Sequence, residues 1–534
     1  MLMRRFLKYT LLAVICVGAT ACADFLDKPS YSDYEGKDLI NRQGMTGLLN
    51  GIYDNFQSSS YYGASIYGYE ISKGPDFFVR VSSGGSFERE CRYSENTASP
   101  GAATSIWTQI YKTIRTATDL IEKLHAGVPD MEEQEIRMYL GEAHGLRALA
   151  YFDLMRLFAW MPRFSIEGGE EYEERYSLGV PIMDTTDMAI NPFKYKIRRA
   201  TAADSYKYIE DEFKLAKENL QGLETGSGHI NYVAVCGLMA RLYLYMERWE
   251  DVIEVGEEAI AAAGAYDFLS YSSYKTSYYQ SFNCENIWEL AYTETDNCGG
   301  SALNYIARKE TFNNPGAEND GKVSKALGYA AYGLFPQAQN ILRKKSGAVE
   351  DVRGYLICDL GVNANPDYKG CRKYVGSSYH YVYNIPVIRL PEIYLTVAEA
   401  YLHLGNVPAA DEYYKALRAV RVLETSGFET ADPEEALGLL LEERRRELIM
   451  EGHTYWDYFR RGATMVREKV IENVRRRTVN FGLDKEQGRW QVIYPIPLKE
   501  LEANKDIRDQ QSPGYDSYGD VYGDEVPDTG GEIL

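Results

Sequence analysis

The stretch that decides the fold reads Glu443-Arg-Arg-Arg-Glu-Leu-Ile-Met-Glu-Gly-His-Thr-Tyr-Trp-Asp-Tyr-Phe-Arg-Arg-Gly462. Apolar residues spaced by seven fall on one helical face, as do Leu441, Leu448 and Tyr455. Gly452 allows a neighbouring element to approach closely. Opposite charges four positions apart pair along a helix, which predicts two pairs, Glu442 with Arg446 and Asp457 with Arg461. We therefore expect a packed structural helix here rather than a ligand site.

Three further blocks alternate small and large residues in the manner of helix pairs, where small residues let two helices approach and large ones fill the gaps. The clearest is Ala398–Val420, with a glycine turn at Gly405. A second covers Val233–Ala263, and a looser third combines Ile106–Leu124 with Glu135–Leu157. Such pairs cannot bury their apolar faces alone. The sequence therefore predicts a mainly α-helical scaffold of stacked pairs.

Two stretches between these blocks have a different character. Gln57–Ser105 is rich in Gly, Ser and Tyr and has no sustained period, and Tyr266–Asn384 contains only short apolar runs such as Asn286–Ala291. Trp288 lies in that run, which we expect to be a short buried strand. Long loops in a folded protein are usually functional or contain small strands, so the two stretches are predicted to carry the ligand site.

The first residues have the pattern of an export signal. Positive charges at Arg4, Arg5 and Lys8 precede Leu11–Thr20, and this run is far shorter than the about 20 apolar residues that span a bilayer. Small residues then lead to Cys22. A cysteine at this point is typical of a bacterial lipoprotein signal, in which residues 1–21 are removed and the Cys22 thiol carries the lipid. An ordinary secretory peptide with an incidental Cys22 is the alternative.

The amino-acid composition disfavours some classes of binding partner. The formal net charge of −20 argues against nucleic acid and anionic membrane surfaces, which need clustered Lys and Arg. The number of tyrosines, 45, is unusually high. Tyrosine offers a rigid, half-apolar ring with a polar tip, which suits protein interfaces and stacking on sugar rings. For any single tyrosine, filling a contact between helices is the plainer interpretation.

The cysteines give no metal or redox motif, because none forms a C-x-x-C pair. An oxidising compartment permits disulfides, and the locally plausible pairs are Cys284 with Cys298 and Cys358 with Cys371. Cys236 lies in a helical pattern, where a buried free thiol is expected.

Catalytic and nucleotide-binding signatures are absent from the sequence: it has no zinc-protease, nucleophile-elbow, P-loop or complete dinucleotide-binding motif. His453 and Asp457 have helical metal-ligand spacing, but a structural hydrogen-bonding role is favoured. The acidic tail Asp516–Leu534 has no Lys or Arg, and a solvated flexible tail is favoured over a cation site. Paired carboxylates of a glycoside hydrolase carry no local signature, so the sequence gives no support for an enzyme and a glycoside hydrolase is kept as an alternative.

With these residues in view, the stretch Glu443–Gly462 resembles the SusD/RagB family of outer-membrane lipoproteins. The resemblance extends over nearly the whole chain, in the order and spacing of that family. The matching segments are Cys22-Ala-Asp-Phe-Leu-Asp, the helix positions Trp107, Tyr111 and Ile114, Arg147–Leu154, Asp351 with Arg353, Arg389–Ala400, Tyr494-Pro-Ile-Pro and Pro513-Gly-Tyr.

The resemblance implies a SusD-like fold in which four tetratricopeptide-like helix pairs face a loop-rich, ligand-binding half. Residues 22–534 would form one body, with the helical scaffold at 106–265 and 386–462, the ligand-facing segments at 57–105 and 266–384, and the acidic tail at 516–534. It also implies a binding protein without catalysis, anchored by lipid on the outside of the outer membrane. No cofactor and no metal-ligating residue are predicted, and whether a metal ion assists binding is left open. Such a protein captures glycans, or in some members peptides, for a SusC-like TonB-dependent transporter. A lipid-anchored glycoside hydrolase is the alternative from another class.

Sugar recognition needs aromatic faces and planar polar side chains, because every buried hydroxyl must find a partner. Two loop segments combine these types, which makes the predicted ligand-binding residues Asp76, Phe77, Phe78, Arg80, Tyr292, Asp296, Asn297, Asn304 and Tyr305. The rings at Phe77, Phe78, Tyr292 and Tyr305 are expected to form a stacking platform. If they belong to the core instead, the other tyrosines of Tyr266–Asn384 are the next candidates.

Overall fold

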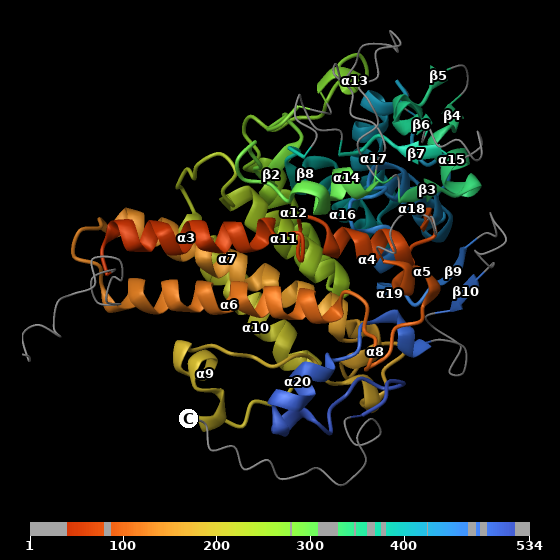
Figure 1. Ribbon diagram of the computed structural model, residues 1–534. Helices are drawn as coiled ribbons and strands as arrows, with labels where there is room; N and C mark the ends of the chain where they lie inside the picture. The colour runs from red at the N-terminus through yellow and green to blue at the C-terminus, as the bar shows by residue number, and fades with distance from the viewer. Residues whose placement is uncertain are drawn as a thin grey trace, which may run out of the picture.

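The long helices follow one another in space in nearly the order of the chain (Figure 1). The computed structural model describes residues 40–79, 87–277, 280–307, 329, 331–346, 349–359, 369–374, 381–423, 426–467, 477–480 and 489–517. The long helices are α3 (Arg42–Gln57), α6 (Ala103–Ala126), α7 (Glu133–Phe158), α10 (Ala202–Leu220), α11 (Tyr232–Tyr245), α12 (Trp249–Ala261), α16 (Leu390–His403), α17 (Val407–Arg421) and α18 (Pro433–Glu447). The predicted helical scaffold is confirmed: α6 packs on α7, α11 on α12 and α16 on α17.

The α16–α17 pair shows how the sequence makes these turns. Gly405 has a φ of 74°, a left-handed conformation that glycine adopts without steric cost. The side chain of Asn406 then accepts a hydrogen bond from the Ala409 amide at 3.2 Å and caps α17. Where α12 crosses α16, a Cβ on Gly256 would lie 2.4 Å from Val397 Cγ2, so only glycine allows this approach.

The remaining elements are short. The short helices are α4 (Ser65–Lys73), α5 (Glu88–Arg92), α8 (Pro162–Ser165), η2 (Glu174–Tyr176), α9 (Thr186–Ile190), η3 (Pro192–Lys194), α13 (Tyr274–Ser277), η4 (Gly299–Ser301), α14 (Leu303–Ala307), α15 (Pro336–Leu342), η5 (Val352–Leu356), α19 (Thr454–Arg460), η6 (Arg489–Val492), α20 (Leu498–Ala503) and η7 (Lys505–Ile507). The stretch 57–105, expected to be loop, thus contains α4 and α5. All of α4 is buried, and a helix buried on every side has no amphipathic period to reveal it.

The described strands form antiparallel two-stranded ribbons. They pair β1 (Phe77–Val79) with β3 (Tyr332–Leu334), β2 (Asn286–Leu290) with β8 (Ile385–Arg389), β4 (Lys345–Ser346) with β5 (Val349–Glu350), β6 (Ile357–Asp359) with β7 (Lys369–Cys371), and β9 (Thr464–Arg467) with β10 (Arg477–Asn480). The predicted buried strand at Asn286–Ala291 is confirmed as β2, whose residues, Trp288 included, are all buried.

The stretch Glu443–Gly462 differs from its prediction in one respect. It is buried and packed as expected, but α18 ends at Glu447 and α19 begins at Thr454, because Met450 and Gly452 take positive φ values of 67° and 76°. A Cβ on Gly452 would lie 3.1 Å from the Tyr67 ring, so the predicted close approach is confirmed.

The two predicted ion pairs in this stretch have opposite outcomes. Arg446 Nη2 lies 2.6 Å from Glu442 Oε1 as predicted. The predicted pair of Asp457 with Arg461 is wrong, because Asp457 instead accepts from Arg444 and Arg460, each at 2.9 Å. The restart of the helix at α19 places Arg460 three positions further along the same face, and Arg444 reaches across from α18.

The described cysteines are not joined in disulfides; they are Cys91, Cys236, Cys284, Cys298, Cys358 and Cys371. Cys236 is buried as predicted, and the two locally plausible pairs, Cys284 with Cys298 and Cys358 with Cys371, are not formed. In the β6–β7 ribbon, Cys358 lies opposite Gly370 and Cys371 opposite Ile357. Neighbouring positions of a strand face opposite sides of a ribbon, so the two thiols point apart. Among the described residues, no helix is long and apolar enough to cross a bilayer.

Candidate functional site

A pocket lined by tyrosines lies where the α3–α4 turn meets the segments that flank β2 and β8. Its lining residues are Gly63, Tyr292, Cys298, Ala302, Leu303, Asn304, Tyr374, Tyr381, Tyr383 and Ile385. We call it the tyrosine pocket. It is shallow, with a volume of about 10 Å³, which is room for about one water molecule. A ligand larger than water would therefore rest on its rim and its rings rather than sink into it.

The rings of the tyrosine pocket are held by contacts with the core. Tyr374 and Tyr383 meet edge to face with centroids 5.2 Å apart, a favourable arrangement for aromatic pairs. The Tyr374 hydroxyl donates to the Met450 carbonyl at 2.7 Å, and the Tyr292 hydroxyl donates to the Gln57 carbonyl at 2.8 Å. Tyr374 and Tyr292 are buried, whereas Tyr381 and Tyr383 are only half-buried. The latter two thus supply the accessible ring surface.

The backbone around Tyr292 is also fixed. Its amide donates to Asn384 Oδ1 at 3.0 Å, and Asn384 Nδ2 donates to Glu289 Oε1 at 2.7 Å. Burial raises the pKa of the Tyr292 and Tyr383 hydroxyls well above their usual range. These hydroxyls therefore keep their protons at neutral pH, and because the proton of Tyr292 is already donated to Gln57, the Tyr292 oxygen can serve a ligand only as an acceptor.

The structure brings two of the predicted residues together and places others apart. Tyr292 and Asn304 line the same pocket. Asp296 is exposed, and Asn297 donates to the Thr293 and Glu294 carbonyls at 3.0 and 2.9 Å, so its amide organises its own loop. Arg80 and Cys22 lie outside the described residues, as does the side chain of Tyr305, whose backbone belongs to α14.

The expectation that Phe77 and Phe78 are exposed loop rings is wrong. Both are buried in β1, with exposed fractions of 2% and 1%. The Phe78 ring covers Gly333 of the partner strand β3, where a Cβ would approach it to 2.3 Å. The preceding Asp76 is buried as well, and it accepts a hydrogen bond from Arg445 Nε at 2.7 Å. These side chains hold β1 in the core and offer no open ring face.

Sequence reasoning missed Tyr374, Tyr381 and Tyr383 as site residues, although it named the stretch that contains them as the next place to search. The available signal was their clustering immediately before the apolar strand β8. Their approach to Tyr292 depends on the pairing of β2 with β8, which no local pattern predicts.

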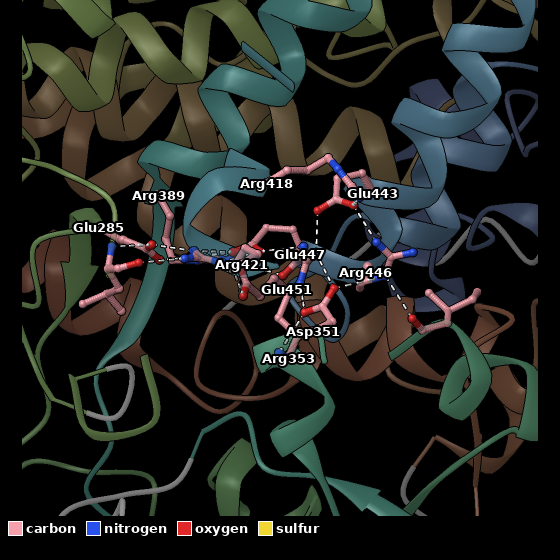
Figure 2. Close-up of polar contacts among 12 residues, drawn as sticks. Glu285, Asp351, Arg353, Arg389, Arg418, Arg421, Glu443, Arg446, Glu447 and Glu451 are labelled. Atoms are coloured by element: carbon pink, nitrogen blue, oxygen red, sulfur yellow. Dashed lines mark hydrogen bonds and ion pairs between the residues drawn. The ribbon is translucent and has the colours of Figure 1, made fainter. Parts of the chain in front are cut away.

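A buried group of ion pairs, which we call the ion-pair cluster, lies around the end of α18 (Figure 2). It contains Glu285, Asp351, Arg353, Lys373, Arg389, Arg418, Arg421, Glu443, Arg446, Glu447 and Glu451. Lys373 pairs with Glu451, donates to the Glu447 carbonyl at 2.7 Å where α18 ends, and is the residue before Tyr374. The cluster therefore anchors the pocket's tyrosine wall to α18.

Glu447 is the centre of the ion-pair cluster (Figure 2). Its carboxylate accepts from Arg353 Nη1 at 3.0 Å, Arg421 Nε at 3.0 Å and Arg389 Nη1 at 3.1 Å. Burial raises the pKa of a carboxyl group, but the three guanidinium groups outweigh it and hold the pKa of Glu447 well below its usual range. Its stabilising effect is therefore present at neutral pH and is lost progressively as the pH falls from the range where free carboxylates take up protons toward the lowered pKa of Glu447.

The described residues include no group of three His, Cys, Asp or Glu side chains that could hold a metal ion. The side chain of His453 lies 3.5 Å from Glu392, not against Asp457. Its link to Asp457 is through the backbone, where the Asp457 amide donates to the His453 carbonyl at 2.8 Å. Both residues are buried structural groups, as the sequence interpretation favoured.

Comparison with known proteins identifies the family. The model of the SusD family matches residues 304–515, and the model described as "Starch-binding associating with outer membrane" matches residues 24–244. A solved SusD superfamily protein from Bacteroides thetaiotaomicron is 27% identical, has a TM-score of 0.75, and is covered over 100% of its length by 89% of this chain. The chain belongs to the SusD family.

Other SusD-like proteins are similar to this chain in sequence or in fold. The SusD-like protein P38 of Formosa agariphila is 23% identical over 400 residues, which are 68% of this chain and 74% of that protein. A structure described as a laminarin-binding SusD-like protein has a TM-score of 0.67 at 22% identity, with 89% of this chain and 100% of that one covered. The SusD motif residues Asp351, Arg353, Arg389 and Glu447 fall in the ion-pair cluster, so the motif marks the framework of the fold.

Proposed function

We propose that this protein captures oligosaccharides at the cell surface and delivers them to a SusC-like TonB-dependent transporter of the outer membrane, without catalysing a reaction itself. The observation that carries the proposal is the tyrosine pocket in a SusD-family chain. Two half-buried rings, Tyr381 and Tyr383, stand beside Asn304 and the neutral hydroxyl of Tyr292. Rings that stack on the apolar face of a sugar, with an amide and hydroxyls for its hydroxyl groups, are what sugar recognition requires.

A peptide-binding role within the same family is the second candidate, because tyrosine-rich surfaces also suit protein ligands. The two candidates differ in what competes for the pocket. In an oligosaccharide-binding protein, neutral oligosaccharides would compete with one another for the tyrosine pocket. A peptide-binding protein would not bind them. A lipid-anchored glycoside hydrolase would release new reducing ends during incubation, and the proposal expects none.

Replacing Tyr381 by Ala is expected to weaken oligosaccharide binding by about 1–3 kcal/mol, or roughly ten- to a hundredfold, because the ring is an accessible contact of the proposed site. The measurement is calorimetric titration with a panel of starch and laminarin fragments, accompanied by an assay for reducing ends. Tyr172→Ala is the matched control, since Tyr172 is half-buried outside the pocket. Wild-type affinity in the Tyr381 variant, or tight peptide binding without glycan binding, would contradict the proposal.

The lipid anchor is a separate part of the proposal and is placed at Cys22, which lies outside the described residues. Replacing Cys22 by Ser is expected to abolish retention in the membrane fraction, because the thiol is the proposed point of attachment and a hydroxyl does not replace it. Fractionation of cells and metabolic labelling with a fatty acid measure the change. A Cys22→Ser variant that stays at the cell surface as the wild type does would refute the anchor.

A further inference from the structure

A wide groove, which shares no lining residue with the tyrosine pocket, lies where β2 meets the chain that enters α11 and leaves α12. It has a volume of about 850 Å³, within the size range of about 300–1,000 Å³ for pockets that enclose small-molecule ligands. Its walls are the α10–α11 loop, the end of α12 and the start of β2, with Phe282, Asn283 and Cys284 along one edge. We call it the β2 groove.

At the edge of the groove, Phe282 has an unfavourable backbone conformation and an exposed ring. Phe282 has a φ of 54° and leaves 49% of its surface exposed. A bulky residue in the left-handed region is strained, and an exposed phenyl ring gains little from burial. A hydrogen bond stabilises this backbone conformation: the Phe282 amide donates to the buried Glu289 carboxylate at 2.5 Å. Strain of this kind concentrates at ligand sites.

Two polar side chains of the groove lining, Asn286 and His229, are candidates to bind a ligand. Asn286 is 7% exposed, its Nδ2 donates to Glu289 Oε2 at 2.5 Å, and its Oδ1 has no hydrogen-bond partner among the described residues. A buried acceptor left unpaired costs free energy. On the opposite wall, His229 Nδ1 is bound to the buried Glu142 at 2.7 Å, which leaves Nε2 as the ring nitrogen available to a ligand.

The walls that present these groups are fixed. Trp288 Nε1 donates to the Gly228 carbonyl at 3.0 Å and ties the α10–α11 loop to β2. Asn231 Nδ2 donates at 3.0 Å to both the Tyr266 hydroxyl and the Ile287 carbonyl, while its Oδ1 caps α11. A site whose walls are already hydrogen-bonded loses little entropy on binding.

We infer that the β2 groove is a second saccharide site, distinct from the tyrosine pocket, in which the Phe282 ring stacks on a sugar while Asn286 and His229 bind its hydroxyls. A neutral oligosaccharide is the ligand class that fits, because the lining supplies aromatic rings, Tyr232, Tyr266 and Phe282 among them, beside three asparagine amides, and the protein's net charge of −20 disfavours polyanions. The choice of ligand class rests on the proposed function, whereas the site itself rests on the groove.

Two native thiols report on the two sites separately. Cys284 is exposed and lines the groove, whereas Cys298 lines the tyrosine pocket. The full-length protein would be treated with iodoacetamide at mildly alkaline pH, with and without short starch and laminarin fragments, and the alkylation of each cysteine followed by mass spectrometry. A ligand in the groove slows the alkylation of Cys284, and a ligand in the pocket slows that of Cys298.

The variant is Phe282→Gly, which removes the ring and suits the positive φ, so the fold is expected to be retained. Leu423→Gly is the matched control, because Leu423 is exposed at a φ of 53° outside the groove. We expect saccharide to protect Cys284 in the wild type and in the control, and protection in the Phe282 variant to need about tenfold more ligand. Protection of Cys298 should be unchanged.

The outcomes separate this inference from the proposed function. Protection of Cys298 alone, or protection of Cys284 that survives Phe282→Gly unchanged, overturns the groove as a saccharide site and leaves the proposed function standing. Loss of Cys284 protection in Tyr381→Ala as well would show one coupled site and overturn the inference of two. Protection at neither thiol, together with no calorimetric binding, overturns both proposals.

Discussion

Replacing Glu447 by Gln is expected to lower the free energy of unfolding by about 3–5 kcal/mol, the usual cost of removing one partner from a buried ion pair. The carboxylate is fully buried and accepts from Arg353, Arg389 and Arg421. A neutral amide would leave those guanidinium groups short of negative charge and would turn an NH₂ group toward N–H donors. The measurement is a urea titration followed by circular dichroism, in which the midpoint falls while the slope stays the same.

The matched control is Glu350→Gln, the same chemical change at the exposed ion pair between Lys345 and Glu350. Such a pair is solvated in both the folded and the unfolded chain, so the midpoint should not move. An equal loss in the two variants would mean that the effect comes from the amide substitution itself. Wild-type stability in Glu447→Gln would show that the ion-pair cluster does not hold the fold together.

The ion-pair cluster also shows which parts of the fold can be predicted from the sequence and which cannot. Helix pairs such as α16–α17 were predictable because their period, their glycine turn and their small residues are all local. The meeting of Asp351, Arg353 and Arg389 around Glu447 was not, since these residues come from different elements and nothing in their spacing brings them together. The helix α4 was missed for a related reason, because a helix buried on all sides shows no alternation of polar and apolar residues.

Some residues of the candidate site were also predictable from local sequence, and others were not. Tyr292 and Asn304 were predicted from residue chemistry within one segment, and both line the tyrosine pocket. Tyr381 and Tyr383 reach that pocket only through the pairing of β2 with β8, so their place depends on tertiary structure. A strand of three residues, such as β1, is too short to show an alternating pattern, which is why Phe78 was expected in a loop.

Replacing Phe78 by Ala is expected to destabilise the protein by about 3–5 kcal/mol, the range for removing a buried aromatic ring and leaving a cavity. The ring is 1% exposed, covers Gly333, and lies edge to face with Phe335 at a centroid distance of 5.6 Å. Because glycine has no side chain that could fill the space, the cavity should persist rather than collapse. Urea titration measures the loss.

Oligosaccharide affinity of the Phe78→Ala protein, measured by calorimetry under conditions where it stays folded, should equal that of the wild type, because the buried ring has no face to offer a ligand. Phe282→Ala provides the comparison for stability: it is the same substitution at a ring that is 49% exposed, so its effect on unfolding should be far smaller. If Phe78→Ala instead loses affinity while keeping its stability, the ring contacts the ligand directly, and β1 must open when the ligand binds.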